Sequence, residues 1–203
     1  MFSGAQISLY PMTGDFVSVI LGALEAIDPY RKRFRIETDD LSTLVVGPPE
    51  ELFPLMRDLF VAAAKSGVHV VLSATVSRGC PGEPDAEICT PTTDLGRVSQ
   101  GADAIETSLA AVDAAARTGQ TVAAQFSYYP LGDGRHMDEI YAAIDFLKES
   151  GVFDRAKNFC TKLRGDAGPV FATLGEAFLN FAPEGAHVAL DLTVSANSPT
   201  RVR

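Results

Sequence analysis

The sequence predicts an α+β protein made of tandem duplicated ferredoxin-like βαββαβ repeats with antiparallel sheets. Three observations predict this fold. Blocks of sequence recur, Tyr10 as Tyr129 and His69 as His187, at offsets of 119 and 118 residues. Each copy then shows period-two and helical hydrophobic patterns in the same order. Finally, a stretch rich in Pro, Gly, Thr and Asp separates the copies.

The internal repeat is the strongest of these signals. Four blocks return in order with a net slip of one residue, which chance does not explain. They are 5–12 (AQISLYPM) as 124–131 (AQFSYYPL), Thr43 and Gly47 as Thr161 and Gly165, 67–70 (GVHV) as 185–188 (GAHV), and 75–77 (TVS) as 193–195 (TVS).

Each copy contains four segments with strand-like patterns. The first alternates in character and ends at a proline, the next two are short, and the last is a longer alternating run. In the first copy these strands are expected at 4–11, 33–38, 41–46 and 68–77, and in the second at 123–130, 154–158, 159–164 and 186–195.

Helical stripes lie between the strands. The first helix of each copy follows the first strand, and the second opens after the hairpin, with Pro49 suited to a first turn. The apolar stripes are Phe16, Val19, Ile20, Ala23, Leu24 and Ile27; Met137, Ile140, Tyr141, Ile144 and Leu147; Leu52, Leu55, Met56, Leu59, Phe60 and Ala63; and Phe171, Leu174, Phe178 and Phe181.

The connection between the copies begins with a stretch that has no periodic hydrophobic pattern. Residues 78–101 are expected to form a loop, and Ile105, Leu109, Val112 and Ala116 then make a narrow helical stripe. We therefore place one repeat at 1–78, a linker loop and helix at 79–120, and a second repeat at 121–203.

Composition narrows the class of protein. The chain has 203 residues, 17 basic against 26 acidic, for a net charge of −9, which argues against a nucleic-acid partner. No stretch reaches the ~18 apolar residues of a membrane span, and no signal peptide is visible. The three cysteines have no CxxC spacing, so a cytoplasmic location is expected.

Strand alternation points to a polar sheet face. Gln6, Ser8 and Tyr10 share one face of the first strand, next to the hydroxyls of Ser73 and Thr75. Two similar sheets could pack through such faces, within the chain or across a homodimer. The same polar groups with an aromatic ring could equally bind a planar heterocycle.

The third strand leaves the pocket's location open. Thr161 alternates in phase with Phe159 and Leu163, so Thr43 and Thr161 could face the helices instead. A pocket between helices and sheet would then be possible, and periodicity does not decide between the two locations.

Several motifs resemble those of the YkoF family of thiamin/hydroxymethylpyrimidine-binding proteins over almost the whole chain. They are 8–13 (SLYPMT) with Asp15 and Phe16, Thr38-Asp39 followed by Ser42-Thr43, 79–82 (GCPG), Tyr129-Pro130 and 195–199 (SANSP). The resemblance implies a duplicated ferredoxin-like fold, a homodimer, one ligand site per repeat, a role in salvage of the thiamin pyrimidine, and no catalysis. It implies no further cofactor.

The resemblance also implies the site residues. Carried over by position, the first site uses Ser8, Tyr10, Asp39, Ser42 and Thr43, and the second uses Ser127, Tyr129, Asn158 and Thr161. The second copy departs from the pattern, with Asn158 where the first has an acid and Cys160 in place of Ser42. The two sites are therefore expected to differ.

Two other functional classes remain as alternatives. A small enzyme could use Cys80 as nucleophile with His69 or His187 as base, although Cys80 has no counterpart in the second copy. A regulatory effector-binding module without catalysis is also compatible with this fold. No spacing of His and Cys predicts a metal site.

Overall fold

The computed structural model describes residues 2–80, 102–131, 137–182 and 186–200. Its elements follow the predicted order twice, with one extra helix between the copies. They are β1 (Phe2–Pro11), α1 (Phe16–Glu25), the 3₁₀ turn η1 (Asp28–Tyr30), β2 (Arg35–Thr38), β3 (Thr43–Val46), α2 (Pro49–Ala64), β4 (Val70–Cys80), α3 (Ala102–Asp113), β5 (Thr121–Leu131), α4 (Met137–Glu149), β6 (Phe153–Ala156), β7 (Thr161–Asp166), α5 (Ala167–Asn180) and β8 (His187–Ala196). The predicted α+β class with antiparallel pairing is confirmed.

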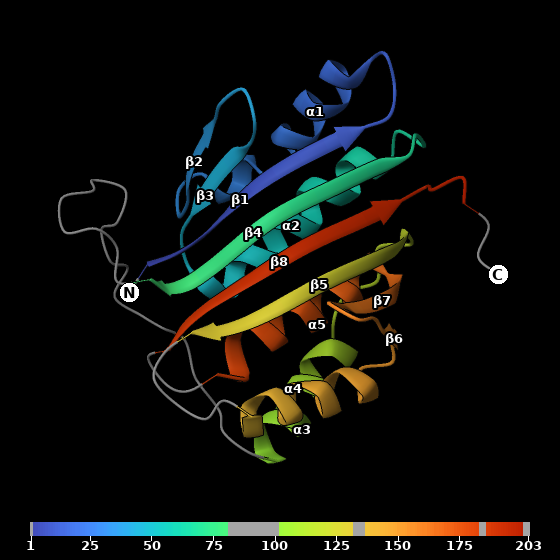
Figure 1. The fold of residues 1–203 in the computed structure, drawn as a ribbon. Coiled ribbons are helices and arrows are strands. Elements are labelled where there is room, and N and C mark those ends of the chain that lie inside the picture. Colours follow the sequence, from blue (N-terminus) through green and yellow to red (C-terminus); the bar gives the residue numbers. More distant parts are fainter. Residues whose placement is uncertain (1, 81–101, 132–136, 183–185, 201–203) are drawn as a thin grey trace.

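The two repeats form one continuous sheet. Its strand order is β2-β3-β1-β4-β8-β5-β7-β6, so the last strands of the two repeats are neighbours at its centre (Figure 1). The expectation that two sheets could pack face to face within the chain is therefore wrong. In each repeat β4 or β8 lies on an edge, and joining these two edges satisfies backbone groups that would otherwise be exposed.

Side-chain hydrogen bonds join the two repeats at both ends of the central seam, which is the pairing of β4 with β8. His69 Nε2 lies 2.9 Å from Ser195 Oγ, and His187 Nε2 lies 2.8 Å from Ser77 Oγ. His69 directly precedes β4, His187 is the first residue of β8, and each contacts a serine of the other repeat. The recurring histidines thus have a structural role that follows the pseudo-symmetry of the duplication.

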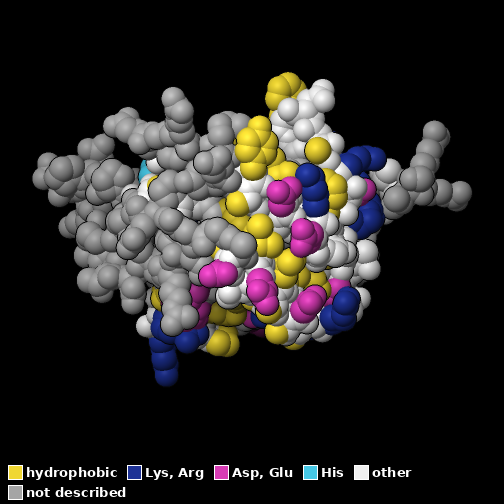
Figure 2. Space-filling view, turned by 90° about the horizontal axis from the view of Figure 1, so that it is seen from below, with side chains coloured by type: hydrophobic (Ala, Val, Ile, Leu, Met, Phe, Trp, Pro, Cys, Tyr) yellow, Lys and Arg dark blue, Asp and Glu magenta, His cyan; other side chains and the backbone are white. Residues whose placement is uncertain are grey.

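All the described helices lie on one side of the sheet, and the side that none of them covers is called the open face (Figure 1). The two repeats share a core on the helical side, where the Phe53 and Phe178 rings are 5.5 Å apart and the Phe60 and Phe171 rings 6.2 Å apart. Seen from below, where α3 and α4 lie, acidic side chains are scattered among apolar ones (Figure 2). Among the described residues, no helix is both long and apolar enough to cross a membrane.

The second strand of each hairpin begins two residues later than the sequence pattern predicts. Strands expected at 41–46 and 159–164 begin at Thr43 and Thr161, so Leu41, Ser42 and Phe159 belong to turns. Side-chain hydrogen bonds to the turn backbone, described below, stop the ladder at this point.

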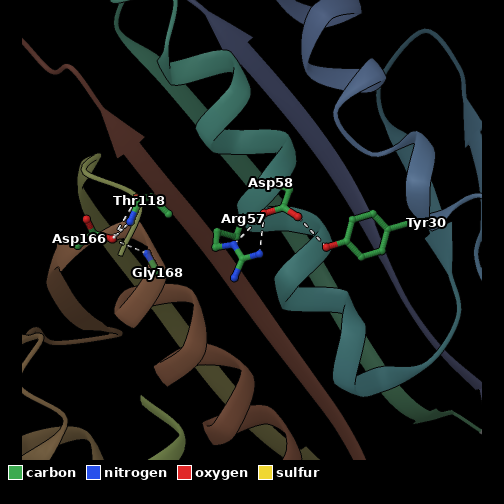
Figure 3. Close-up of polar contacts among 6 residues, drawn as sticks. All are labelled: Tyr30, Arg57, Asp58, Thr118, Asp166 and Gly168. Carbon is green, nitrogen blue, oxygen red and sulfur yellow. Dashed lines mark hydrogen bonds and ion pairs between the residues drawn. The ribbon is translucent and has the colours of Figure 1, made fainter. Parts of the chain in front are cut away.

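Polar clusters fix two of the connections (Figure 3). Asp166 caps α5 by accepting a hydrogen bond from Gly168 N at 2.8 Å, and it also accepts from Thr118 N at 2.9 Å. Tyr30 donates to Asp58 at 2.7 Å, and Arg57 donates to the same carboxylate at 2.8 Å. Burial, followed by the hydrogen bond to Asp58, raises the pKa of Tyr30 above its ordinary value.

A buried arginine joins the two halves. The Arg78 side chain extends from β4 of the first repeat and is 0% exposed. Its Nε donates to Phe178 O at 2.7 Å and its Nη2 donates to Leu179 O at 3.1 Å, at the C-terminal end of α5. The guanidinium also lies 5.6 Å from the centre of the Phe178 ring. A cation here satisfies carbonyls that a helix end leaves without partners.

We predict that Arg78→Met lowers the free energy of unfolding by about 2–4 kcal/mol, because methionine fills similar space but leaves those carbonyls unsatisfied. Urea denaturation followed by circular dichroism measures the change. Arg31→Met is the matched control, since Arg31 forms an exposed ion pair with Asp28 and should change stability by less than ~0.5 kcal/mol. If both variants lowered the free energy of unfolding equally, the hydrogen bonds of Arg78 to α5 would not stabilise the fold.

Candidate ligand site in each repeat

The first repeat has a hollow at the end of its sheet, under α1. Its volume is about 310 Å³. Apolar side chains of α1 form one wall, the end of β1 forms a second, and the β2–β3 turn forms a third. The lining residues are Ile7, Ser8, Leu9, Tyr10, Phe16, Ile20, Leu24, Thr38, Asp39, Asp40, Leu41, Ser42, Thr43 and Leu59.

The second repeat has a matching hollow of about 480 Å³ between α4, β5 and the β6–β7 turn. It is lined by Phe126, Ser127, Tyr128, Tyr129, Ile140, Ala143, Ile144, Leu147, Lys148, Phe153, Ala156, Lys157, Asn158, Phe159, Cys160 and Thr161. All nine residues predicted for the two sites line one hollow or the other. The structure thus brings each predicted set together.

The hollows form where the strand ladders stop. The β1–β3 pairing ends with Ile7 opposite Thr43, whereas β1 continues to Pro11. The β5–β7 pairing ends in the same way, with Phe126 opposite Thr161. Beyond these pairs the hairpin turn bends away from the first strand and leaves a gap that the preceding helix covers.

A serine holds each turn at the edge of the gap. The Ser8 hydroxyl donates to Leu41 O at 3.0 Å, and the Ser127 hydroxyl donates to Phe159 O at 2.8 Å. The repeated serine therefore has a structural partner in both copies. Its oxygen can still accept a hydrogen bond, because a hydroxyl has two lone pairs.

The location of the threonines shows which side of the sheet the hollows occupy. Ile7 is 2% exposed against the helices, and Thr43, its partner in the ladder, is 8% exposed on the same side. Thr43 Oγ1 lies 3.0 Å from Thr38 Oγ1. Over β4, β8 and β5 the open face has a groove of about 180 Å³. The two matched hollows are instead on the helix side, at the edges of the sheet.

The acid of the first site also shapes its turn. Asp39 Oδ1 accepts hydrogen bonds from Leu41 N and Ser42 N, each at 2.8 Å. These two bonds lower the pKa of Asp39 below its ordinary value, since they favour the carboxylate form. An acceptor on residue 39 therefore stabilises the turn that forms one wall of the hollow.

The ladders align the two turns residue by residue. Thr38 pairs with Thr43, and Ala156 pairs with Thr161, so Asp39 corresponds to Lys157 and Asp40 corresponds to Asn158. The acid that the sequence placed opposite Asn158 is therefore Asp40. The charge at the position matched to Asp39 is reversed.

The matched charges have different surroundings. Lys157 Nζ donates to Gln125 Oε1 at 2.8 Å, whereas in the first copy Gln6 Nε2 donates to Ser42 Oγ at 2.6 Å. The second hollow is also lined by Lys148, and the first is lined by Asp40. The first hollow is therefore acidic and the second basic.

Apolar residues at the rims were not identified as site residues from the sequence. Leu41 and Phe159 occupy matched positions at the turns and are 80% and 89% exposed, and Phe16 is 50% exposed at the start of α1. Phe16 had been placed in a core stripe, and Phe159 in a strand. Tyr10 and Tyr129 are also half exposed. Exposed apolar groups around a hollow provide surface that a ligand can cover.

The enzyme alternative gains little from the structure. Both histidines proposed as bases have Nε2 next to a serine hydroxyl at the seam. Cys80 lies at the end of β4, opposite Phe2, and its side chain is outside the described residues, as is the loop at 81–101. Within the described part of the chain, no three His, Cys, Asp or Glu residues are grouped to hold a metal ion.

Comparison with known proteins agrees with the resemblance seen in the sequence. The model of the YKOF-related family matches residues 2–83 and 121–201, one segment in each repeat. The chain is also 32% identical over 199 residues to a Bacillus subtilis (strain 168) protein named "Putative HMP/thiamine-binding protein YkoF". This alignment covers 98% of the chain and 92% of the relative.

We predict that the Asp39 carboxylate stabilises its turn in a pH-dependent way. Its folded-state pKa lies below the ~3.9 of an unfolded aspartate, so its contribution is present above that value and is lost as pH falls through the folded pKa. NMR titration of the side-chain carbon should show the lowered pKa. A midpoint at or above ~3.9 would exclude the two backbone hydrogen bonds. Asp39→Ala should deprotect the Leu41 and Ser42 amides, and Asp39→Asn, which keeps an acceptor, should protect them.

Proposed function

The chain belongs to the YKOF-related family, and on this basis we propose that it binds thiamin or its hydroxymethylpyrimidine moiety, one molecule in each repeat. The protein would serve salvage or transport of the pyrimidine and would not catalyse a reaction. The relative's name refers to binding of HMP or thiamine, which supports this ligand class.

The observation that carries the proposal is the pair of matched hollows with the same chemical plan. In each, one wall is apolar and helical, a half-exposed tyrosine lies at the rim, and a serine and a threonine contribute hydroxyls. A planar aminopyrimidine needs an aromatic or apolar surface to stack on and a few fixed donors and acceptors. Volumes of about 310 and 480 Å³ suit a ligand of this size.

Calorimetric titration of the purified chain with thiamin and with hydroxymethylpyrimidine tests the proposal. Saturable binding with two sites per chain supports it. A regulatory module for a different effector would show no saturable heat with either compound.

The charge reversal gives the two hollows different ligand preferences. Thiamin carries a fixed positive charge on its thiazolium, so the carboxylates of Asp39 and Asp40 favour it in the first hollow. Lys157 and Lys148 oppose it in the second. Asp39 and Asp40 are exposed, so solvent screening reduces this attraction to a several-fold preference. Neutral hydroxymethylpyrimidine lacks this interaction.

We predict that Tyr10→Ala weakens binding in the first hollow by ~1 kcal/mol or more, the scale of a lost aromatic contact. The Tyr10 side chain is 53% exposed, so its removal should leave the melting temperature nearly unchanged. Tyr141→Ala is the matched control, because Tyr141 is 57% exposed and does not line the second hollow. A lower melting temperature with unchanged affinity would make Tyr10 a structural residue.

We predict two unequal classes of thiamin site, with the first repeat binding several-fold more tightly. Asp39→Asn keeps the turn acceptor and removes the charge, so it should weaken thiamin and leave hydroxymethylpyrimidine nearly unaffected. Lys157→Asp should strengthen thiamin in the second repeat. Calorimetry with both compounds measures these effects. Equal thiamin sites, or equal losses for both ligands in Asp39→Asn, would contradict the electrostatic account.

We also propose that two chains associate through the part of the open sheet face that β1, β4 and β8 form. That face presents Gln6, Ser73, Thr75 and Thr193 on a surface that no described helix covers. Static light scattering at micromolar concentrations should give twice the 21.6 kDa of one chain. A monomeric mass throughout this range would contradict the association.

A further inference from the structure

A second, larger groove lies on the open face of the second repeat. Its volume is about 970 Å³, and it shares no residue with the hollow under α4. Lys162 and Arg164 alternate along β7 with Leu163, which is 0% exposed against the helices, so the two cations are on the opposite side of the sheet. The groove is thus separate from the proposed ligand site.

Positive charge is concentrated in this groove. Arg155 is the ladder partner of Lys162, and Arg164 follows on the same face. Like charges directly opposite one another destabilise a sheet. Among the described residues that line the groove, Asp154 is the only acid, and its Oδ2 lies 2.6 Å from Lys162 Nζ and 3.9 Å from Arg164 Nε. Three cations therefore face one carboxylate, in a chain with a net charge of −9.

The groove also contains hydrogen-bond donors that a ligand could use. Arg164 Nε is buried and has no hydrogen-bond partner among the described residues. The hydroxyls of Thr121, Ser198 and Thr200 line the same groove. A buried charged donor without an acceptor is costly unless a ligand supplies one.

The first repeat shows that the hairpin does not require these cations to fold. The same ladder register there places Glu37, Leu44 and Val46 where the second repeat has Arg155, Lys162 and Arg164. Both hairpins pair with their first strands in the same way. The basic groove is thus an addition to one copy of a shared scaffold.

We propose that this groove binds a phosphate group, either as a free anion or as part of a phosphate ester. Two guanidiniums, an ammonium and several hydroxyls are the donors that phosphate oxygens accept from most strongly. The size of the groove leaves room for the rest of an ester. The site goes beyond the proposed pyrimidine binding and does not depend on it.

Isothermal titration with inorganic diphosphate at low ionic strength tests the site in the full chain. Wild type should show saturable binding that weakens with added salt. Arg155→Glu, which installs the residue of the first repeat, should weaken binding about tenfold or more. Arg31→Glu makes the same change in net charge at an exposed residue outside the groove, and should weaken binding less than about twofold.

Titration with inorganic phosphate and with glycerol 3-phosphate shows which form of phosphate the groove prefers. Tighter binding of glycerol 3-phosphate supports a phosphate ester, and tighter binding of inorganic phosphate supports a free anion. The proposal is overturned if diphosphate gives no saturable binding, or if Arg31→Glu weakens it as much as Arg155→Glu. It is also overturned if light scattering shows that Arg155→Glu alters the oligomeric mass, since the groove would then be an interface between chains.

Discussion

The ladder between β4 and β8 is the interaction on which the rest of the structure depends. Nine residues of β4, from Val70 to Arg78, pair with β8 and turn two small sheets into one. Each repeat alone would expose this edge, and unpaired backbone groups at a sheet edge promote aggregation. Once the edges join, the helices of both repeats lie on the same side of the sheet and α2 packs against α5 across the seam. The hairpins are then at opposite ends of the sheet, so the two hollows are far apart in the strand order.

The duplication keeps the backbone of the hollow and changes its chemistry. Ser8 and Ser127 donate to matched turn carbonyls, and Gln6 and Gln125 both contact their turns. These anchors fix the wall, and the residues between them are free to vary. Asp39 contributes a backbone-capping carboxylate where Lys157 contributes a cation held by Gln125. One scaffold therefore presents two differently charged openings.

The two faces of the sheet also differ in how freely their side chains can be substituted. The helical side is a close-packed aromatic core, in which Gly47 leaves space for the Phe34 ring and Gly165 leaves space for Val152. Side chains there have little freedom to change. The open side has no such constraint, and there Arg155 and Arg164 replace Glu37 and Val46, with a β-bulge between Phe153 and Arg155 that the first hairpin lacks. New binding chemistry can arise on this side at low structural cost.

The sequence by itself determined the duplication and the element order, and the family resemblance implied nine of the residues that line the two hollows. The duplication and the element order depend on local signals: period-two and helical patterns, prolines at strand ends and recurring blocks. Only the tertiary structure decided how the repeats join, because the pairing of β4 with β8 is a contact between residues more than a hundred positions apart. The strand register assigns Asp39 to Lys157 and Asp40 to Asn158, where the repeat had given only an acid opposite Asn158. The burial of Arg78 follows from the same long-range contact, which no local pattern records.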